Sequence, residues 1–409
     1  MKVLHLVGGD LSAGAARGAY WLHKALVGLG MDSRLFTNSK PIYSDPTIVY
    51  VLKSKIDKLR NLARIEIDSL PFIFYKNRKN TDFSLGFTGY DFTRSEEYKW
   101  ADILHLHWIN GGLVDIKHLS GVKKPVVWTM RDMWPMSGGC HYALDCTRYR
   151  VGCGKCPQLG STRLHDITRW TVKRKRKYYP AEMTLVGISE WLSSTARESL
   201  IFRDFDVVTI HNNIDTGELF PINKRTARAI LRLNTEKKII LYSANRLASP
   251  FKRFDIFADA VRKLDRRKYF FLFFGNVEND NVLRELGFEY KAFGFLYDFI
   301  SLRVVYSACD VFVATSISEA FGKTIAEAMA CGRPVVCFSA TGPKEIVDHK
   351  KNGYLAKPFD PSDLARGIEW VLDPDNYQAV KKNARDKILD RFSSMVIAKQ
   401  YLELYRRLT

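Results

Sequence analysis

Two carboxylates, Glu319 and Glu327, stand eight positions apart in the second half of this 409-residue chain. The mostly apolar run 310–315 precedes them and is typical of a buried parallel strand. Residues 321–330 are rich in helix-forming types, and a Gly-Arg-Pro segment follows them. We therefore expect Glu319 on a loop from strand to helix, and Glu327 about two turns into that helix.

The beginning of this predicted helix suits polar or anionic ligand groups. The backbone N–H groups of Ala320, Phe321 and Gly322 would point out of the positive end of the helix. A second apolar run, 334–338, returns to the sheet and completes a strand–helix–strand unit. Ligands of such sheets bind outside the carboxyl ends of the strands, where Glu319 would lie.

The pattern Glu-x7-Glu, with aromatic-Gly near the first glutamate and Gly-x-Pro after the second, resembles the signature of retaining nucleotide-sugar glycosyltransferases of the GT-B fold. The resemblance is to group 1, a family-4-like set that includes bacterial polysaccharide-biosynthesis enzymes. It implies an α/β protein of two facing Rossmann-like domains with a cleft between them. It also implies that Glu319 contacts hydroxyl groups of the transferred sugar, and that Glu327 binds both ribose hydroxyls of the donor.

Two cations of the second half fit the same resemblance. Arg246 follows a predicted strand over 238–243, and Lys252 stands six positions further on. In the family, an arginine and a lysine at these places bind the donor diphosphate. Two fixed cations beside a helix N-terminus can neutralise a leaving pyrophosphate, so we expect no catalytic metal. The resemblance also gives donor-binding positions to Gly275 and to Phe295, which lies in the segment that brackets the nucleotide base.

The first half begins with an apolar run, 3–7, and a glycine-rich turn that leads into a predicted helix. A strand, a glycine turn and a helix N-terminus together can cradle an anion. A tight turn without any ligand would use the same residues. In the resembled family this loop approaches the donor diphosphate and the acceptor; Gly14 matches that position, and Arg17 is a secondary candidate.

Polar residues follow two further predicted strands of the first half. His105 and His107 share a face of the strand 102–108, because side chains alternate with a period of two. A family histidine near this point contacts the transferred sugar, and His107 fits that role, whereas His105 fits a core position. The two could also bind a metal, but the sequence offers no third ligand nearby. Asp132 follows Arg131, which replaces a histidine common in the family, and could be a base for the incoming hydroxyl, a salt-bridge partner or a helix cap.

Four of the seven cysteines fall within one turn-rich loop, in the order Cys140, Cys146, Cys153 and Cys156. The last two have the C-x2-C spacing of a metal knuckle, whereas the x5 and x6 gaps differ from a standard zinc ribbon. Four thiols can close a tetrahedral structural zinc site with no open position for catalysis. We keep structural zinc, free thiols and disulfides as alternatives, in that order for a reducing compartment, with His141 as a spare ligand.

The net charge is +19 and is spread over both halves, which suits anionic partners such as phosphates, acidic lipid or nucleic acid, or serves solubility alone. Over 53–80, apolar residues at helical spacing are interleaved with lysine and arginine, and an aromatic cluster follows. Such a segment can lie in a membrane interface, or it can be an ordinary surface helix that packs on its own domain. Family acceptors are often lipid-linked, so we expect peripheral contact with an anionic membrane and no nucleic-acid partner.

No apolar run reaches the about 20 residues that span a bilayer, and the N-terminus lacks the apolar region of a signal peptide. We therefore expect a cytoplasmic protein, or a peripheral one at the inner face of the plasma membrane. The expected domains are 1–215 on the acceptor side, with the cysteine-rich loop 138–157, and 216–392 for the nucleotide sugar. A last helix, 393–409, would cross back to the first domain.

The expected reaction is the transfer of a hexose from a UDP- or GDP-linked donor to a hydroxyl of a glycan or polyprenyl-linked acceptor, with retention at the anomeric carbon. Two other functions share the architecture. One is a non-catalytic GT-B scaffold that binds membrane or nucleic acid, against which the two glutamates and two cations argue. The other is a sugar-nucleotide epimerase, whose family lacks the Glu-x7-Glu block.

Overall fold

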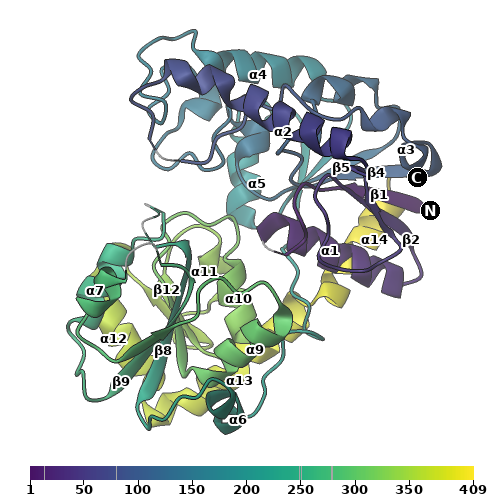
Figure 1. Cartoon of the computed structure of the whole chain (residues 1–409). Helices are drawn as coiled ribbons and strands as arrows, with labels where there is room; N and C mark the ends of the chain where they lie inside the picture. Colours follow the sequence, from purple (N-terminus) through teal and green to yellow (C-terminus); the bar gives the residue numbers. More distant parts are fainter. Residues whose placement is uncertain (13, 80, 248, 250, 278–279) are drawn as a thin grey trace. The chain divides into compact units, whose positions relative to one another are not determined.

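The computed structural model describes residues 1–12, 14–79, 81–247, 249, 251–277 and 280–409, without the side chains of Asn245 and Arg246. The chain divides into two compact units. Unit 1 comprises Met1–His211 and Ile397–Thr409, and unit 2 comprises Asn212–Val396, whereas the sequence placed these divisions at residues 215 and 393. Each unit is built on a parallel sheet with helices around it (Figure 1), which confirms the expected α/β class.

Unit 1 contains a seven-stranded parallel sheet in the order β3-β2-β1-β4-β5-β6-β7. Its strands are β1 (Lys2–Leu6), β2 (Asp32–Thr37), β3 (Ile48–Tyr50), β4 (Ile103–Leu106), β5 (Val126–Met130), β6 (Thr184–Gly187) and β7 (Asp206–Thr209). Its helices are α1 (Gly14–Gly28), α2 (Lys55–Ser69), α3 (Glu96–Trp100), α4 (Ile167–Tyr178), α5 (Glu190–Arg197) and most of α14 (Ser394–Arg406).

The last helix completes the core of unit 1. Ile397, Tyr401 and Tyr405 on α14 are buried together with Val3 of β1 and Val127 of β5. These positions recur every four residues on the helix, so one face of α14 supplies all three side chains. The C-terminal segment is therefore part of the first folding unit, although the chain reaches it only after unit 2.

Unit 2 contains a six-stranded parallel sheet in the order β10-β9-β8-β11-β12-β13. Its strands are β8 (Lys238–Arg246), β9 (Tyr269–Asn276), β10 (Tyr290–Ala292), β11 (Val311–Ala314), β12 (Val335–Phe338) and β13 (Gly353–Ala356). Its helices are α6 (Lys224–Ile230), α7 (Phe254–Val261), α8 (Asn281–Arg284), α9 (Phe299–Ala308), α10 (Lys323–Ala330), α11 (Pro343–Ile346), α12 (Pro361–Leu372) and α13 (Pro374–Arg391).

One face of the unit 2 sheet packs against α7 and α12 through an aromatic core. Tyr242 of β8 and Phe273 of β9 lie in one buried cluster with Phe257 of α7 and Ile368 of α12. Figure 1 shows these two helices on one side of the sheet and α9 and α10 on the other. Strands covered on both faces are expected to be apolar throughout, which explains why the strand at 311–314 was readable from sequence. Among the described residues, no helix is both long enough and apolar enough to cross a lipid bilayer.

Buried histidines cross the centre of the unit 1 sheet. The Nδ1 of His5 lies 2.9 Å from the Nε2 of His107, and the Nη2 of Arg131 lies 3.1 Å from the Nδ1 of His107. Because a guanidinium can only donate, the Nδ1 of His107 accepts and its Nε2 carries the proton that is donated to His5. The nitrogens of His105 are 2.6 Å from the Tyr405 hydroxyl and 2.7 Å from the Thr129 hydroxyl.

These contacts make the histidine cluster a neutral hydrogen-bonded network. His5 is the third imidazole of the cluster, and the sequence did not predict that it lies near His105 and His107. The ligand nitrogens of the three histidines lie within 4.8 Å of one another. Both nitrogens of His105 and of His107 already have partners, and a cation stands beside His107, so the arrangement does not suit a metal ion. His107, the expected sugar contact, is only 2% exposed.

The protonation of these imidazoles is unfavourable in the folded unit. Burial lowers the pKa of His5, His105 and His107 well below the usual value, and the charge of Arg131 lowers it further. Burial also lowers the pKa of His23 to about 4, while its nitrogens bond to Ser33 and Thr47. The unfolded chain would protonate all four from about pH 6.5 downward.

We predict that unit 1 loses stability as the pH falls from 6.5 towards 5. In this window the unfolded state binds more protons than the folded state. Each imidazole therefore lowers the free energy of unfolding by up to about 1.4 kcal/mol for each unit by which the pH falls. Tryptophan fluorescence during urea unfolding is the measurement, because only Trp370 of the eight tryptophans lies outside unit 1.

His23→Gln should reduce by one the number of protons that unfolding takes up, and the slope of the unfolding free energy against pH should fall accordingly. The variant should still fold, because an amide can bond to Ser33 and Thr47. His165→Gln is the matched control, because His165 is exposed and its replacement should leave the slope unchanged. An equal free energy of unfolding at pH 7.5 and pH 5.5 in the unaltered protein would contradict the prediction.

Candidate active site

An ion pair joins the loops that follow β8 and β11 in unit 2. The Nζ of Lys252 lies 2.5 Å from the Oε1 of Glu319, and the two side chains are 22% and 21% exposed. The two strands are neighbours at the point where the strand order reverses, and ligands of parallel sheets bind in the crevice outside that point. The sequence assigned these residues separately to a diphosphate and a sugar; the structure brings them into contact.

Hydrogen bonds between the two loops fix the backbone of Lys252. Its carbonyl oxygen accepts from the Tyr242 hydroxyl at 2.9 Å and from the Thr315 hydroxyl at 2.6 Å. The N–H of Ile317 donates to the carbonyl of Phe251 at 3.0 Å. Since Thr315 and Ile317 belong to the loop after β11, the loop that carries the lysine and the loop that carries the glutamate are held as one piece.

A third loop, after β12, fixes the backbone of Glu319. The N–H of Glu319 donates to the hydroxyl of Thr341 at 3.1 Å, and its carbonyl accepts from the N–H of Gly342 at 3.1 Å. A Cβ at residue 342 would lie 2.6 Å from the Cα of Phe321 and 2.7 Å from the carbonyl oxygen of Ala320. This close approach requires glycine, so the Thr341-Gly342 pair positions the carboxylate.

Glu327 lies deeper than Glu319 and has a different environment. It is 3% exposed on α10, and the hydroxyl of Tyr306 on α9 donates to its Oε2 at 3.1 Å. No sequence pattern pointed to Tyr306, which lies on the helix that precedes β11. A carboxylate held this way can accept hydrogen bonds at a fixed orientation, as recognition of a diol requires.

The expected beginning of the helix needs a correction. Helix α10 starts at Lys323, and Gly322 precedes it with a left-handed backbone, φ 102°. Ala320 and Phe321 therefore lie in the loop before the helix, not in its first turn, and both are buried. Because of the left-handed backbone at Gly322, the helix begins later than the helix-forming composition suggested.

The remaining expected donor positions have distinct surroundings. Gly275 lies within β9, where its N–H donates to the carbonyl of Gly294 at 2.7 Å and an added Cβ would lie 1.8 Å from the Ala244 oxygen. Phe295 is 37% exposed. Arg246 is the last residue of β8, and its side chain lies outside the described part of the structure.

The strand order of unit 1 also reverses beside its first strand, between β1 and β4. The N–H of Gly8, after β1, donates to the carbonyl of Trp108, after β4, at 2.7 Å. Gly14 is the first residue of α1 and has a left-handed φ of 53°. Arg17 is buried, and its guanidinium donates to the carbonyl of Ser12, so it closes the glycine loop from inside.

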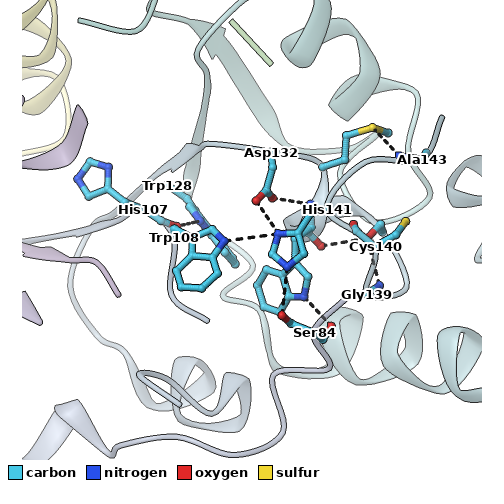
Figure 2. A network of polar contacts seen from close by, with 12 residues as sticks. Ser84, His107, Trp108, Trp128, Asp132, Gly139, Cys140, His141 and Ala143 are labelled. Atoms are coloured by element: carbon cyan, nitrogen blue, oxygen red, sulfur yellow. Dashed lines mark hydrogen bonds and ion pairs between the residues drawn. The ribbon is translucent and has the colours of Figure 1, made fainter. Parts of the chain in front are cut away.

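Asp132 forms a chain of polar contacts with two residues that the sequence did not connect to it (Figure 2). Its Oδ2 lies 2.7 Å from the Nδ1 of His141, and the Nε2 of His141 lies 3.1 Å from the Ser84 hydroxyl. Its Oδ1 accepts from the N–H of Trp134 at 2.8 Å. Of the expected roles for Asp132, the geometry shows an imidazole partner and a turn cap; both carboxylate oxygens are in use.

The four loop cysteines line a single cavity in unit 1. Cys140, Cys146, Cys153 and Cys156 all border it, beside Phe83 and Thr168. All four are unpaired thiols, as are the buried Cys309, Cys331 and Cys337 of unit 2. The four cysteines therefore border one cavity despite the irregular spacing, but among the described residues no three of their sulfur atoms lie within 4.8 Å of one another.

Residues 223–387 match the family model described as Glycosyl transferases group 1. The D-inositol 3-phosphate glycosyltransferase of Mycolicibacterium smegmatis is 31% identical over 68% of this chain and 61% of its own length. The N,N'-diacetylbacillosaminyl-diphospho-undecaprenol alpha-1,3-N-acetylgalactosaminyltransferase of Campylobacter jejuni is 28% identical over 47% of this chain and 52% of its own length. The chain thus spans about half to three fifths of the length of these curated relatives.

Solved structures resemble the whole chain. The sucrose-phosphate synthase of Thermosynechococcus elongatus has a TM-score of 0.71 at 19% identity, over 100% of this chain and 99% of that one. The Anabaena protein HepE, solved with UDP and glucose, has a TM-score of 0.66 at 17% identity and full coverage of both chains. The whole chain has the GT-B fold, and its residues 223–387 match the model of the Glycosyl transferases group 1.

Proposed function

We propose that the protein is a retaining glycosyltransferase that moves a hexose from a UDP- or GDP-linked donor to a hydroxyl of a glycan or polyprenyl-linked acceptor in cell-surface polysaccharide biosynthesis. The observation that carries this proposal is the ion pair of Lys252 and Glu319 at the strand reversal of unit 2, with Glu327 buried on the following helix. A cation, a sugar-binding carboxylate and a ribose-binding carboxylate are the three groups that a nucleotide sugar needs.

Each of these groups has a part in the proposed reaction. The donor diphosphate takes Lys252 as its counter-ion, and Arg246 is the second candidate cation. Glu319, released from the ion pair, accepts hydrogen bonds from the sugar hydroxyls and stabilises the positive charge that develops as the glycosidic bond breaks. The acceptor oxygen attacks from the side that the leaving phosphate vacates, and that phosphate takes the acceptor proton. The protein therefore acts by positioning and electrostatics, with no catalytic metal.

The relatives support the finer points of the proposal. HepE, solved with UDP and glucose, favours a uridine diphosphate donor over the GDP alternative. The name of the Campylobacter relative describes a diphospho-undecaprenol acceptor, which favours a polyprenyl-linked acceptor here. On the acceptor side, the sequence suggested Asp132 alone as the group that acts on the incoming hydroxyl. We assign that role to Asp132 together with His141, whose Nδ1 lies 2.7 Å from the carboxylate.

Lys252→Ala should lower kcat by about 100- to 1000-fold, because the leaving diphosphate loses a preorganised cation. The measurement is sugar release from a panel of UDP- and GDP-hexoses, followed with and without added acceptor. Lys387→Ala is the control, because Lys387 forms a comparable ion pair in unit 2, 2.8 Å from Asp348. Near-normal turnover by the Lys252 variant would remove the lysine from the mechanism, and absence of both hydrolysis and thermal stabilisation with every donor would overturn the proposed activity.

Glu327→Gln should mainly raise the KM for the donor, by about 10- to 100-fold, because a hydrogen bond to a charged acceptor contributes about 1.5–3 kcal/mol. The Tyr306 hydroxyl can still donate to the amide oxygen, so the fold should persist. Glu369→Gln, at an exposed position of α12, is the control. A change confined to kcat, with the donor KM unaltered, would argue against a ribose-binding role.

We also propose that unit 1 contacts an anionic membrane through a surface that we call the α2 patch, which comprises α2 and the following turn Leu70–Phe74. Phe72 of this patch is packed on the domain at 6% exposure, but other apolar side chains are not: the exposed fraction is 61% for Ile56, 69% for Leu59, 69% for Ile73 and 86% for Phe74. In α2 itself the buried residue is a polar one, Asn61. This favours the membrane alternative over a helix that packs on its own domain.

Basic side chains flank the exposed apolar ones in the α2 patch. Lys55, Lys58 and Arg60 on the helix are exposed, as are Lys76 and Arg78 just after it. Cations near an acidic membrane surface contribute about 1 kcal/mol each, and apolar side chains that enter the interface add to this. The chemistry of the patch thus matches phosphatidylglycerol-like headgroups above acyl chains.

The double variant Ile73→Ser/Phe74→Ser should weaken binding to vesicles that contain anionic lipid by at least about tenfold, since a buried apolar side chain of this size contributes about 1.5–3 kcal/mol. Co-sedimentation with anionic and with neutral vesicles is the measurement. Ile300→Ser, at a 65% exposed position of unit 2, is the control. Equal sedimentation of the double variant and the unaltered protein would show that the patch does not bind membrane.

A further inference from the structure

The four cysteines of the loop 138–157 in unit 1 border one cavity. Two of the cysteines flank a tight turn, Cys153 to Cys156, and the other two come from the segment before it. The cavity that all four border is also lined by Phe83, Gly138, Arg148, Tyr149, Gln158 and Thr168. None of the four is needed by the proposed sugar transfer, so the loop requires its own explanation.

The backbone of the C-x2-C turn is held in a conformation that few residues adopt. Gly152, Cys153, Gly154 and Lys155 all have positive φ, at 91°, 59°, 86° and 47°. For Cys153 and Lys155 this left-handed geometry is unfavourable, and it persists only where the surroundings enforce it. The effect here is to turn two sulfur atoms towards one cavity.

Neighbouring elements lock this turn in place. The N–H of Gly154 donates to the Thr168 hydroxyl at 2.9 Å, and the N–H of Cys156 donates to Asp166 at 2.9 Å. An added Cβ at residue 154 would lie 2.1 Å from the carbonyl oxygen of Leu164, so only glycine fits. Asp166 and Thr168 begin α4, which ties the sulfur-bearing turn to a long helix of the domain.

A buried lysine lies beside the cluster. Lys175 of α4 is 0% exposed, and its Nζ donates to the carbonyls of Trp134 and Ser137. The hydroxyl of Ser137 donates in turn to the carbonyl of Cys140 at 2.7 Å. Four thiolates around a divalent cation carry a net charge of −2, which a protonated Lys175 would partly offset.

We propose that Cys140, Cys146, Cys153 and Cys156 bind one zinc ion as four thiolates, and that this ion positions His141 for the acceptor side of the site. Binding exchanges four thiol protons for the metal, with no change of oxidation state. Tetrahedral coordination by four sulfurs is closed, so the ion is structural. Disulfide pairing would use the same thiols but would leave no charge for Lys175 to offset.

His141 connects the zinc loop to the polar chain of Figure 2. It follows Cys140 directly; its carbonyl accepts from the N–H of Met133 at 2.9 Å, and its imidazole lies between Asp132 and Ser84. Phe83 pairs with Cys140 in an antiparallel bridge, so the next residue, Ser84, lies beside the segment that contains Cys140. A metal that holds Cys140 therefore fixes the residue before His141 and the segment that carries Ser84, which makes His141 a residue positioned by the metal site.

Metal analysis of the full-length protein, purified under reducing conditions with zinc in the medium, should find about one zinc per chain. Cys146→Ala and Cys156→Ala should lower that ratio strongly, whereas Cys337→Ala, a buried cysteine of unit 2, should leave it unchanged. If the loop variants fail to fold, titration of the unaltered protein with an organomercurial should release zinc to a chelating dye as thiols are consumed. Replacement by Co²⁺ should give the sulfur-to-metal charge-transfer and ligand-field absorption of a tetrahedral tetrathiolate.

Zinc absent from the unaltered protein together with no cobalt spectrum, or disulfides found by mass spectrometry under reducing purification, would overturn the metal site. The link to His141 has its own measurement: the rate at which diethyl pyrocarbonate modifies His141, located by peptide mass spectrometry. Removal of zinc should raise this rate several-fold, with exposed His165 as the internal control. An unchanged rate at His141 would show that the ion does not position it.

Discussion

In both units, successive strands are first added on one side of the first strand and then on its other side. This reversal of strand order determines which loops lie next to each other. In unit 2, β8 lies between β9 and β11, and in unit 1, β1 lies between β2 and β4. At such a point the two connections leave towards opposite sides, so a crevice opens outside the carboxyl ends of the strands. Lys252 and Glu319 meet at one crevice, and Gly8 and Trp108 meet at the other.

The ion pair of unit 2 is better understood as a binding device than as a source of stability. Two charges in a partly dehydrated crevice lose hydration, and their attraction returns a similar free energy. What stabilises the arrangement is the backbone: Tyr242 and Thr315 bind the carbonyl of Lys252, and Thr341 binds the N–H of Glu319. The pair therefore keeps both side chains oriented at little net cost. In the proposed reaction, Lys252 would exchange the carboxylate for a phosphate and Glu319 would exchange the ammonium for sugar hydroxyls.

The sequence predicted the features that depend on local pattern. Apolar runs located the parallel strands, and the Glu-x7-Glu spacing located the loop and the helix on which Glu319 and Glu327 lie. It could not predict contacts made by strand order, such as Lys252 with Glu319 or His5 with His107, because these partners lie 67 and 102 positions apart. It also placed the start of α10 too early, since helix propensity does not reveal the left-handed turn at Gly322.

The acceptor side shows why a substitution in a motif need not remove a chemical group. Arg131 stands where the resembled family often has a histidine, and in this chain the guanidinium turns inward, with its Nη2 3.1 Å from the Nδ1 of His107. Burial lowers the pKa of Arg131 to about 10, which still leaves it charged at neutral pH, so it can complete the core network and cannot act as a base. The imidazole beside Asp132 comes instead from His141, nine residues further along the chain. The loop that carries the His141 imidazole must be as rigid as the end of a strand. In the proposed zinc site, metal binding by the cysteines of this loop would provide that rigidity.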